Sequence, residues 1–103
     1  MKTLIQTRHQ EIDDTLRRYI LNRVKSALSI LVNNVSNVLV KLNSNACPEG
    51  GKLKVCEIEV TVQGHELVVA SGQRTHWLAA IDQAVEAAAR AVRRTIGKKK
   101  KSA

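Results

Sequence analysis

Residues 54–63 read KVCEIEVTVQ, and from Cys56 onward apolar and polar side chains alternate without interruption. Successive side chains of a β-strand point to opposite faces, so this period of two predicts a strand. One face of the strand is apolar and the other is largely charged. We therefore expect a sheet that is covered on one face and open to water on the other.

Three further strands are predicted from runs of apolar and β-branched residues, over residues 2–6, 35–43 and 66–71. A turn-rich loop over residues 44–51, which holds the only proline, separates the second strand from KVCEIEVTVQ. A turn at Gln63-Gly64-His65 follows that stretch, and Gly72-Gln73-Arg74 is expected to end the last strand.

Two helices are predicted from apolar residues spaced three to four positions apart. The first is expected over residues 14–31, with Asp13 as its N-cap, and its apolar face is formed by Leu16, Ile20, Val24, Ala27, Leu28 and Leu31. The second is expected to follow the N-cap candidate Thr75 and to end at Gly97. Its apolar face is formed by Leu78, Ile81, Val85, Ala88, Ala89, Val92 and Ile96.

The order β-α-β-β-β-α defines the expected fold class. It predicts a two-layer α+β domain in which two helices pack on one face of a mixed four-stranded sheet. A chain of 103 residues suits one domain. We expect residues 1–97 to form that domain and residues 98–103 to form a flexible basic tail.

The charge balance indicates the class of partner. The chain has 17 Lys and Arg against 9 Asp and Glu, a formal net charge of +8, which favours a polyanionic partner. No apolar run approaches the length of a membrane span, and the first residues lack the apolar stretch of a signal peptide. We therefore expect a cytoplasmic protein without a membrane partner.

Residues for catalysis or metal binding are not arranged in a recognisable pattern. The three histidines and two cysteines lack the spacing of a metal site or of a nucleophile with its base. Asp82 and Glu86 are one helical turn apart and are interpreted as solvated surface acids. We expect no enzymatic activity, no cofactor, no metal and no small-molecule substrate.

Aromatic residues are scarce, since Tyr19 and Trp77 are the only two. They are too few for a sheet face that stacks successive bases of a single strand. We interpret Trp77 as a partly buried packing residue.

Basic residues gather on the predicted outer faces of the helices. A rotation of about 100° per residue places Arg18 and Lys25 opposite the core of the first helix, with Arg17 and Arg23 flanking the core face. The second helix and the tail add the basic residues Arg90, Arg93, Arg94, Lys98, Lys99, Lys100 and Lys101. Such a surface suits nucleic-acid phosphates, because each neutralised phosphate releases counterions. The alternative is that these charges only solvate the helices, with Glu86 and Arg90 forming an ordinary i,i+4 pair.

Two motifs point to a family. The segment EIDDTLRRYI at residues 11–20 and the segment AAID at residues 79–82, combined with the β-α-β-β-β-α order, make the chain similar to the bacterial ribosome-hibernation factors. This family comprises the ribosome-associated inhibitor and the short hibernation-promoting factors, and is also called the sigma-factor modulation family. The resemblance covers almost the whole chain. The chain departs from the family pattern at His76, Trp77, Leu78 and Ala87. It resembles a short form of the family.

The resemblance implies a double-stranded-RNA-binding-like fold that occupies the small-subunit channel, where it overlaps the paths of mRNA and tRNA. It also implies rRNA contacts by basic residues at matching positions, namely Arg17, Arg23, Arg90, Arg94 and Lys98. The helical positions add Arg18, Lys25 and Arg93 to this expected set, and the tail adds Lys99, Lys100 and Lys101.

We therefore expect a non-enzymatic translation inhibitor that binds the small ribosomal subunit and its rRNA through a basic helical face. A ribosome-dimerising protein is a further possible partner. Two alternatives stay open: a general double-stranded-RNA-binding module, and a protein-interaction modulator of a transcription factor.

Overall fold

Four strands and two helices follow one another in the predicted order β-α-β-β-β-α. The computed structural model describes residues 1–7, 12–31, 33–46 and 51–97. The elements along the chain are β1 (Lys2–Thr7), α1 (Asp14–Leu28), the 3-10 turn η1 (Ser29–Leu31), β2 (Val35–Ala46), β3 (Lys52–Val62), β4 (Val68–Arg74) and α2 (Trp77–Gly97).

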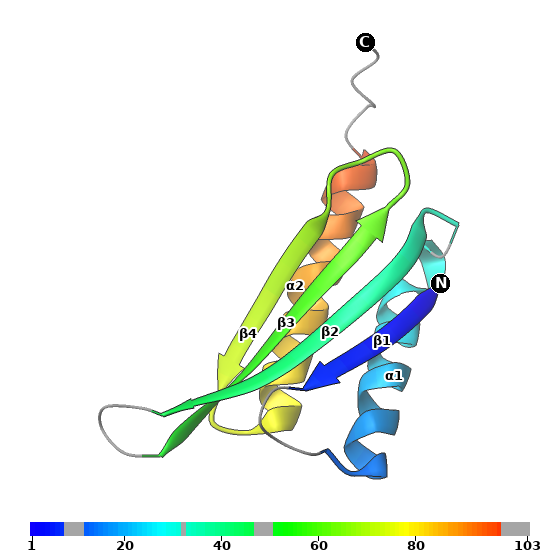
Figure 1. Cartoon of the computed structure of the whole chain (residues 1–103). Coiled ribbons are helices and arrows are strands. Elements are labelled where there is room, and N and C mark those ends of the chain that lie inside the picture. Colours follow the sequence, from blue (N-terminus) through cyan, green and yellow to red (C-terminus); the bar gives the residue numbers. More distant parts are fainter. Residues whose placement is uncertain (8–11, 32, 47–50, 98–103) are drawn as a thin grey trace.

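The strands form one mixed sheet in the order β1-β2-β3-β4. β1 and β2 run parallel, whereas β2–β3 and β3–β4 are antiparallel pairs. Both helices cover the same face of the sheet, behind the strands in Figure 1, and they run side by side in the same direction. The predicted two-layer α+β fold is confirmed.

The alternation in β3 determines which face is covered. Cys56, Ile58, Val60 and Val62 are almost fully buried under the helices, with exposed fractions of 0–2%. The residues between them point to the open face, where Lys41 lies 3.8 Å from Glu57 and also forms an ion pair with Glu59. A sheet with one covered and one solvated face follows from this pattern, as expected.

The helix α2 approaches β4 very closely at Gly72. A Cβ atom at this glycine would lie 2.3 Å from the carbonyl oxygen of Ala80 and 2.8 Å from the amide nitrogen of Ala84. Both alanines are completely buried. The small side chains of α2 and the missing side chain of Gly72 therefore allow backbone-to-backbone packing of helix on strand.

This close packing explains why one predicted boundary is wrong. Gly72-Gln73-Arg74 was expected to end the last strand, but β4 runs from Val68 through Arg74. Gly72 pairs with Cys56 and Arg74 pairs with Lys54 in the sheet. The glycine thus accommodates the helix rather than a turn, and the strand begins and ends later than residues 66–71.

Two other boundaries shift in the same modest way. The α-helical part of α1 ends at Leu28 and continues as the 3-10 turn η1, whereas one helix over residues 14–31 was expected. The strand β2 extends through Ala46, paired with Lys52 of β3, so strand replaces the first part of the predicted loop. Residues 47–50 of that loop lie outside the described residues.

A side chain of α2 covers part of the outer edge of β4. The backbone N–H of Gln73 donates a hydrogen bond of 2.9 Å to Oε1 of Gln83. In an antiparallel ladder, successive residues alternate between bonding the neighbouring strand and facing outward. Gln73 is therefore an outward-facing residue of the edge strand, and Gln83 satisfies its amide.

Candidate nucleic-acid interface

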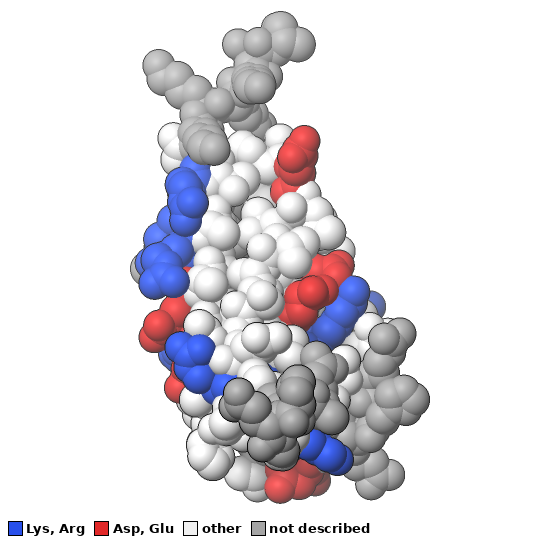
Figure 2. All heavy atoms as spheres, turned by 90° about the vertical axis from the view of Figure 1, so that its left-hand side faces the viewer, with Lys and Arg blue, Asp and Glu red and all other residues white. Residues whose placement is uncertain are grey.

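The outer side of the helix layer is basic. Arg18 and Lys25 of α1 and Arg90 and Arg94 of α2 are all exposed. Figure 2 shows Lys and Arg atoms along its left margin, the side on which the helices lie. None of these four side chains forms an ion pair with a described carboxylate. Their positive charge is therefore available to an external anion.

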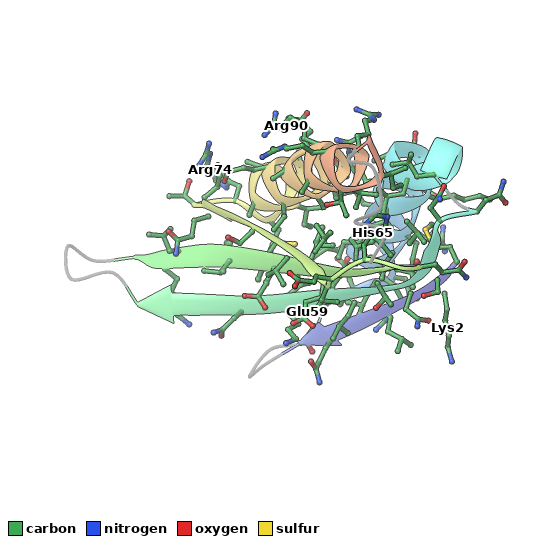
Figure 3. The ribbon with its side chains drawn as sticks, turned by 90° about the horizontal axis from the view of Figure 1, so that it is seen from above. Lys2, Glu59, His65, Arg74 and Arg90 are labelled. Atoms are coloured by element: carbon green, nitrogen blue, oxygen red, sulfur yellow. The ribbon has the colours of Figure 1, made fainter. Side chains whose placement is uncertain are left out.

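Arg93 and Arg74 extend this basic side. Arg93 is exposed on α2, as expected, and Arg74 is exposed at the end of β4. Figure 3 shows that Arg74 and Arg90 both lie on the helix side of the sheet. Arg74 was not among the basic contacts expected from the sequence, because the strand was expected to end at Gly72-Gln73-Arg74. The register of β4 with Lys54 is what places its side chain on the helix side.

Not every predicted cation belongs to one continuous surface. Arg17 precedes Tyr19 by two residues, which corresponds to about 200° around the helix. Because Tyr19 points toward α2, the exposed side chain of Arg17 lies on the flank of α1 that faces away from α2. The predicted tail residues Lys98, Lys99, Lys100 and Lys101 lie outside the described residues.

Arg23 is turned inward, toward the second helix. Its Nε donates a hydrogen bond of 2.9 Å to Oδ1 of Asp82, and the hydroxyl of Tyr19 donates one of 2.5 Å to the same oxygen. Glu86 lies one turn further along α2, 4.0 Å from Nη2 of Arg23. The interpretation of Asp82 as a merely solvated acid is therefore wrong, since Asp82 joins the two helices.

The shared carboxylate changes the titration of both its partners. The hydrogen bond to Asp82 is the main reason why the pKa of Tyr19 is raised above 10.0, because the phenol must keep its proton to donate. The same carboxylate, through its hydrogen bond, raises the pKa of the Arg23 guanidinium. Arg23 stays charged at every physiological pH, so this contact between the helices does not depend on the protonation of Arg23.

The contacts of Arg23 with Asp82 and Glu86 leave the arginines on the outer surface unpaired. The acids between the helices, Asp82 and Glu86, are both nearest to Arg23. The i,i+4 pair of Glu86 with Arg90 that the spacing allows is not formed among the described residues. One inward-facing arginine thus engages the nearby carboxylates and leaves Arg90 unpaired.

The beginning of α2 differs from the prediction. The helix begins at Trp77, so His76 rather than Thr75 precedes its first residue. Trp77 is half-buried against the core, as expected, and Nζ of Lys54 lies 5.3 Å from the centre of its ring. Leu78 was placed on the apolar core face, but its side chain is 51% exposed. It lies in the first turn of α2, where a groove separates it from α1.

Three further observations concern metal binding, membrane spanning and the reactivity of a thiol. No group of three or more His, Cys, Asp or Glu side chains within the described ranges is placed to hold a metal ion. Neither helix of the described chain is both long and apolar enough to cross a membrane. The thiol of Cys56 is buried in the core, and this burial raises its pKa to about 12, which makes it a poor nucleophile.

Comparison with solved structures identifies proteins of the same fold. A ribosomal subunit interface protein from Coxiella burnetii superimposes with a TM-score of 0.76 over 91% of this chain and 97% of that chain, at 13% identity. The N-terminal domain of Protein Y from Thermus thermophilus superimposes with a TM-score of 0.66 over 91% of this chain and 98% of that chain, at 25% identity. Among curated protein sequences, none matches significantly.

A family model matches almost the entire chain. The model describes the sigma 54 modulation protein / S30EA ribosomal protein family, and it aligns with residues 3–100. This range includes both helices, all the strands except the first residue of β1, and the basic positions up to the start of the tail. The match agrees with the resemblance carried by the segments at residues 11–20 and 79–82. The chain therefore belongs to the sigma 54 modulation protein / S30EA ribosomal protein family, the family of the ribosome-hibernation factors.

Proposed function

We propose that this chain binds the small ribosomal subunit through the outer side of its helix layer and occupies the channel that carries mRNA and tRNA. Binding there blocks translation sterically and keeps the ribosome idle. The expected contacts are between rRNA phosphates and the exposed cations of the helix layer, chiefly Arg18, Lys25, Arg90, Arg93 and Arg94. Arg74 joins this set because the structure exposes it on the same side of the sheet.

Membership in the family supports the general part of this proposal. The chain is a ribosome-associated hibernation protein, and it is not an enzyme, because the family is non-enzymatic. Family membership supports ribosome binding, and we propose the small subunit and its rRNA as the specific partners, in the cytoplasm. A ribosome-dimerising protein is a further proposed partner, and residues 98–103 are proposed as an additional basic contact.

One observation carries the specific part of the proposal. Arg90 and Arg94 project from a packed helix and have no described carboxylate partner, although two acids lie on the same helix. Asp82 and Glu86 are instead oriented toward Arg23. Charges held in place by a folded helix match fixed phosphates at little entropic cost, whereas flexible side chains on a flexible segment must be ordered first.

Charge reversal at matched positions tests the proposal. Arg90→Glu and Lys2→Glu make the same change in net charge at exposed residues, but Figure 3 shows them on opposite sides of the molecule. We expect Arg90→Glu to weaken binding to purified small subunits and to lower the slope of log affinity against log salt by about one. Lys2→Glu should change both quantities much less. Equal effects of the two variants would show that only net charge matters and would contradict a helical interface.

Arg23 has a different proposed role, and a second comparison tests it. The side chain holds α1 against α2, so we assign it to positioning the basic face rather than to direct contact with phosphate. Arg23→Gln should therefore lower the thermal stability of the domain as well as the affinity. Arg94→Gln should lower affinity with a much smaller change in melting temperature, because Arg94 loses no described ion pair and only the weak attraction of a cation to the C-terminal end of α2.

A further inference from the structure

An open groove separates the first turns of the two helices. It has a volume of about 450 Å³ and is lined by Ile12, Asp13, Thr15, Leu16, Tyr19, Trp77 and Leu78. Figure 1 shows that both helices begin at the same end of the molecule. The chain contains one tyrosine, one tryptophan and no phenylalanine, and both Tyr19 and Trp77 line this groove.

The walls of the groove are held in place from behind. Tyr19 is fixed by its hydrogen bond to Asp82, and Trp77 packs against the core with Lys54 over its ring. Leu78 contributes an apolar surface that is 51% exposed, although it occupies a helix position at which core residues were expected. The groove is therefore a preformed apolar site, and an occupant would not have to order it first.

The charges around the groove define the chemistry of an occupant. Lys54 lies 5.3 Å from the centre of the Trp77 ring, and Arg74 is its partner across the β3–β4 ladder. Arg18 directly precedes the lining residue Tyr19 in α1. Arg18 and Arg74 are exposed and form no ion pair with a described residue. Cations close in sequence or space to both aromatic lining residues, beside the single lining acid Asp13, suit a nucleotide, which offers a planar base and flanking phosphates.

One carboxylate adds a hydrogen-bonding edge to the groove. Asp13 caps α1 by accepting a hydrogen bond of 2.8 Å from the Leu16 amide through Oδ1. Its other oxygen, Oδ2, accepts no bond from a described residue. A carboxylate oxygen can accept a hydrogen bond from the exocyclic amino group of a base, as Asp and Glu do with cytosine.

We propose that this groove binds an unpaired nucleobase of the small-subunit rRNA. The inference rests on the proposed function, because it assigns a specific contact within the same ribosome-binding surface. The base lies against Tyr19, Trp77 and Leu78, while Arg18 and Arg74 contact its neighbouring phosphates. Paired bases are stacked inside a duplex and cannot enter, so the groove selects an rRNA position that is unpaired.

A matched pair of variants tests the groove on the ribosome. Leu78→Glu places a negative charge in the groove, and Leu67→Glu places the same charge at a leucine that is 53% exposed and does not line it. We expect Leu78→Glu to reduce affinity for small subunits by about tenfold or more relative to Leu67→Glu. Circular dichroism and thermal melting of both variants check that each remains folded.

Tryptophan fluorescence tests the same contact in the unmodified protein. Trp77 is the only tryptophan, so its emission reports on the groove directly. We expect a short single-stranded oligoribonucleotide to quench this emission, and the blunt duplex of the same sequence to bind without comparable quenching. Equal quenching by both RNAs, or none by the single strand, would overturn the assignment of an unpaired base.

The two experiments separate the possible failures. If Leu78→Glu and Leu67→Glu bind small subunits equally well, the groove is not a contact although the proposed function stands. If Leu78→Glu weakens binding to intact small subunits but not to their protein-free rRNA, a ribosomal protein fills the groove and the base assignment is wrong. If the unmodified protein does not bind small subunits, the proposed function fails, and quenching by single-stranded RNA still decides whether the groove takes a base.

Discussion

At the scale of single residues, Asp82 is the acid on which the arrangement of the helices depends. One of its oxygens accepts hydrogen bonds from Tyr19 and Arg23, which lie 63 and 59 positions away in the sequence. The contact is partly exposed, with 41% of the Asp82 side chain accessible. Each hydrogen bond therefore contributes about 1 kcal/mol or less to stability. The larger effect of Asp82 is on geometry, because its two hydrogen bonds fix the orientation of α1 relative to α2 and so the surface that the helices present to a ligand.

Titration of Tyr19 tests this connection directly. Its pKa is raised above 10.0 by the hydrogen bond to Asp82, so the folded protein retains the phenolic proton longer than the unfolded chain does. The stability that this provides is present below pH 10 and is lost as the pH rises through the higher folded-state pKa. We expect the ultraviolet absorbance of the phenolate to appear with a midpoint above pH 10.0.

Asp82→Asn provides the control for that titration. The amide lacks the negative charge that disfavours the phenolate and accepts hydrogen bonds less strongly, so the midpoint should fall toward the ordinary value for tyrosine. The melting temperature should fall as well, while Arg90 and Arg94 keep their exposed positions. An unchanged midpoint in Asp82→Asn would show that the hydrogen bond between Tyr19 and Asp82 does not form in solution.

At the scale of elements, the packing of α2 on β4 depends on the absence of a side chain at Gly72. A methyl group there would collide with the backbone of α2 at Ala80 and Ala84. Neither neighbour can rotate away, because both contacting atoms belong to the main chain. The helix therefore has to move, and with it the arginines on its outer side.

We expect Gly72→Ala to lower the free energy of unfolding by about 1–3 kcal/mol. Gly97→Ala is the matched control, since a Cβ at Gly97 would have no described atom within 4 Å. It removes a helical glycine at the end of α2 and should be neutral or slightly stabilising. Urea unfolding monitored by circular dichroism measures both, and equal values for the two variants would contradict the close approach of helix and strand.

At the scale of the whole molecule, the two faces differ in charge. Four exposed cations without described ion pairs lie on the helix layer, namely Arg18, Lys25, Arg90 and Arg94. On the open face of the sheet Lys2 is exposed, but Lys41 is paired with Glu57 and Glu59. In Figure 2 basic atoms predominate along the left margin, where a few acidic atoms lie among them, whereas acidic and basic atoms adjoin one another on the right-hand side. Such a charge distribution orients the protein as it approaches an RNA surface, with the helices toward the phosphates.

Competition in a cell-free translation system tests the steric part of the proposed function. The protein should slow translation without consuming nucleotide or substrate. Excess initiator tRNA and mRNA should relieve this inhibition, because they require the same space on the small subunit. Lys2→Glu should inhibit as the unmodified protein does, and Arg90→Glu should inhibit less. Inhibition that is insensitive to tRNA and mRNA would place the protein elsewhere on the ribosome.

The local pattern of the sequence was sufficient for most of the fold. The alternation in residues 54–63 predicts both the strand and its buried face, and the spacing of apolar residues predicts both helices. The family motifs at residues 11–20 and 79–82 are local as well. Each of these signals depends on neighbours within one or two turns of helix or a few residues of strand, where periodicity determines which side chains share a face.

The tertiary structure alone decided the features that depend on distant partners. Gly72 was expected at the end of the strand, but it lies within β4, where the backbone of α2 packs against it at Ala80 and Ala84. Arg74 lies on the basic side only because β4 continues and pairs it with Lys54. Leu78 has the spacing of a core residue, yet it lies beside a groove where the two helices leave it exposed. The exposure of a side chain and the partner of a charge are set by the elements that surround it in space, and a helical period carries no information about those elements.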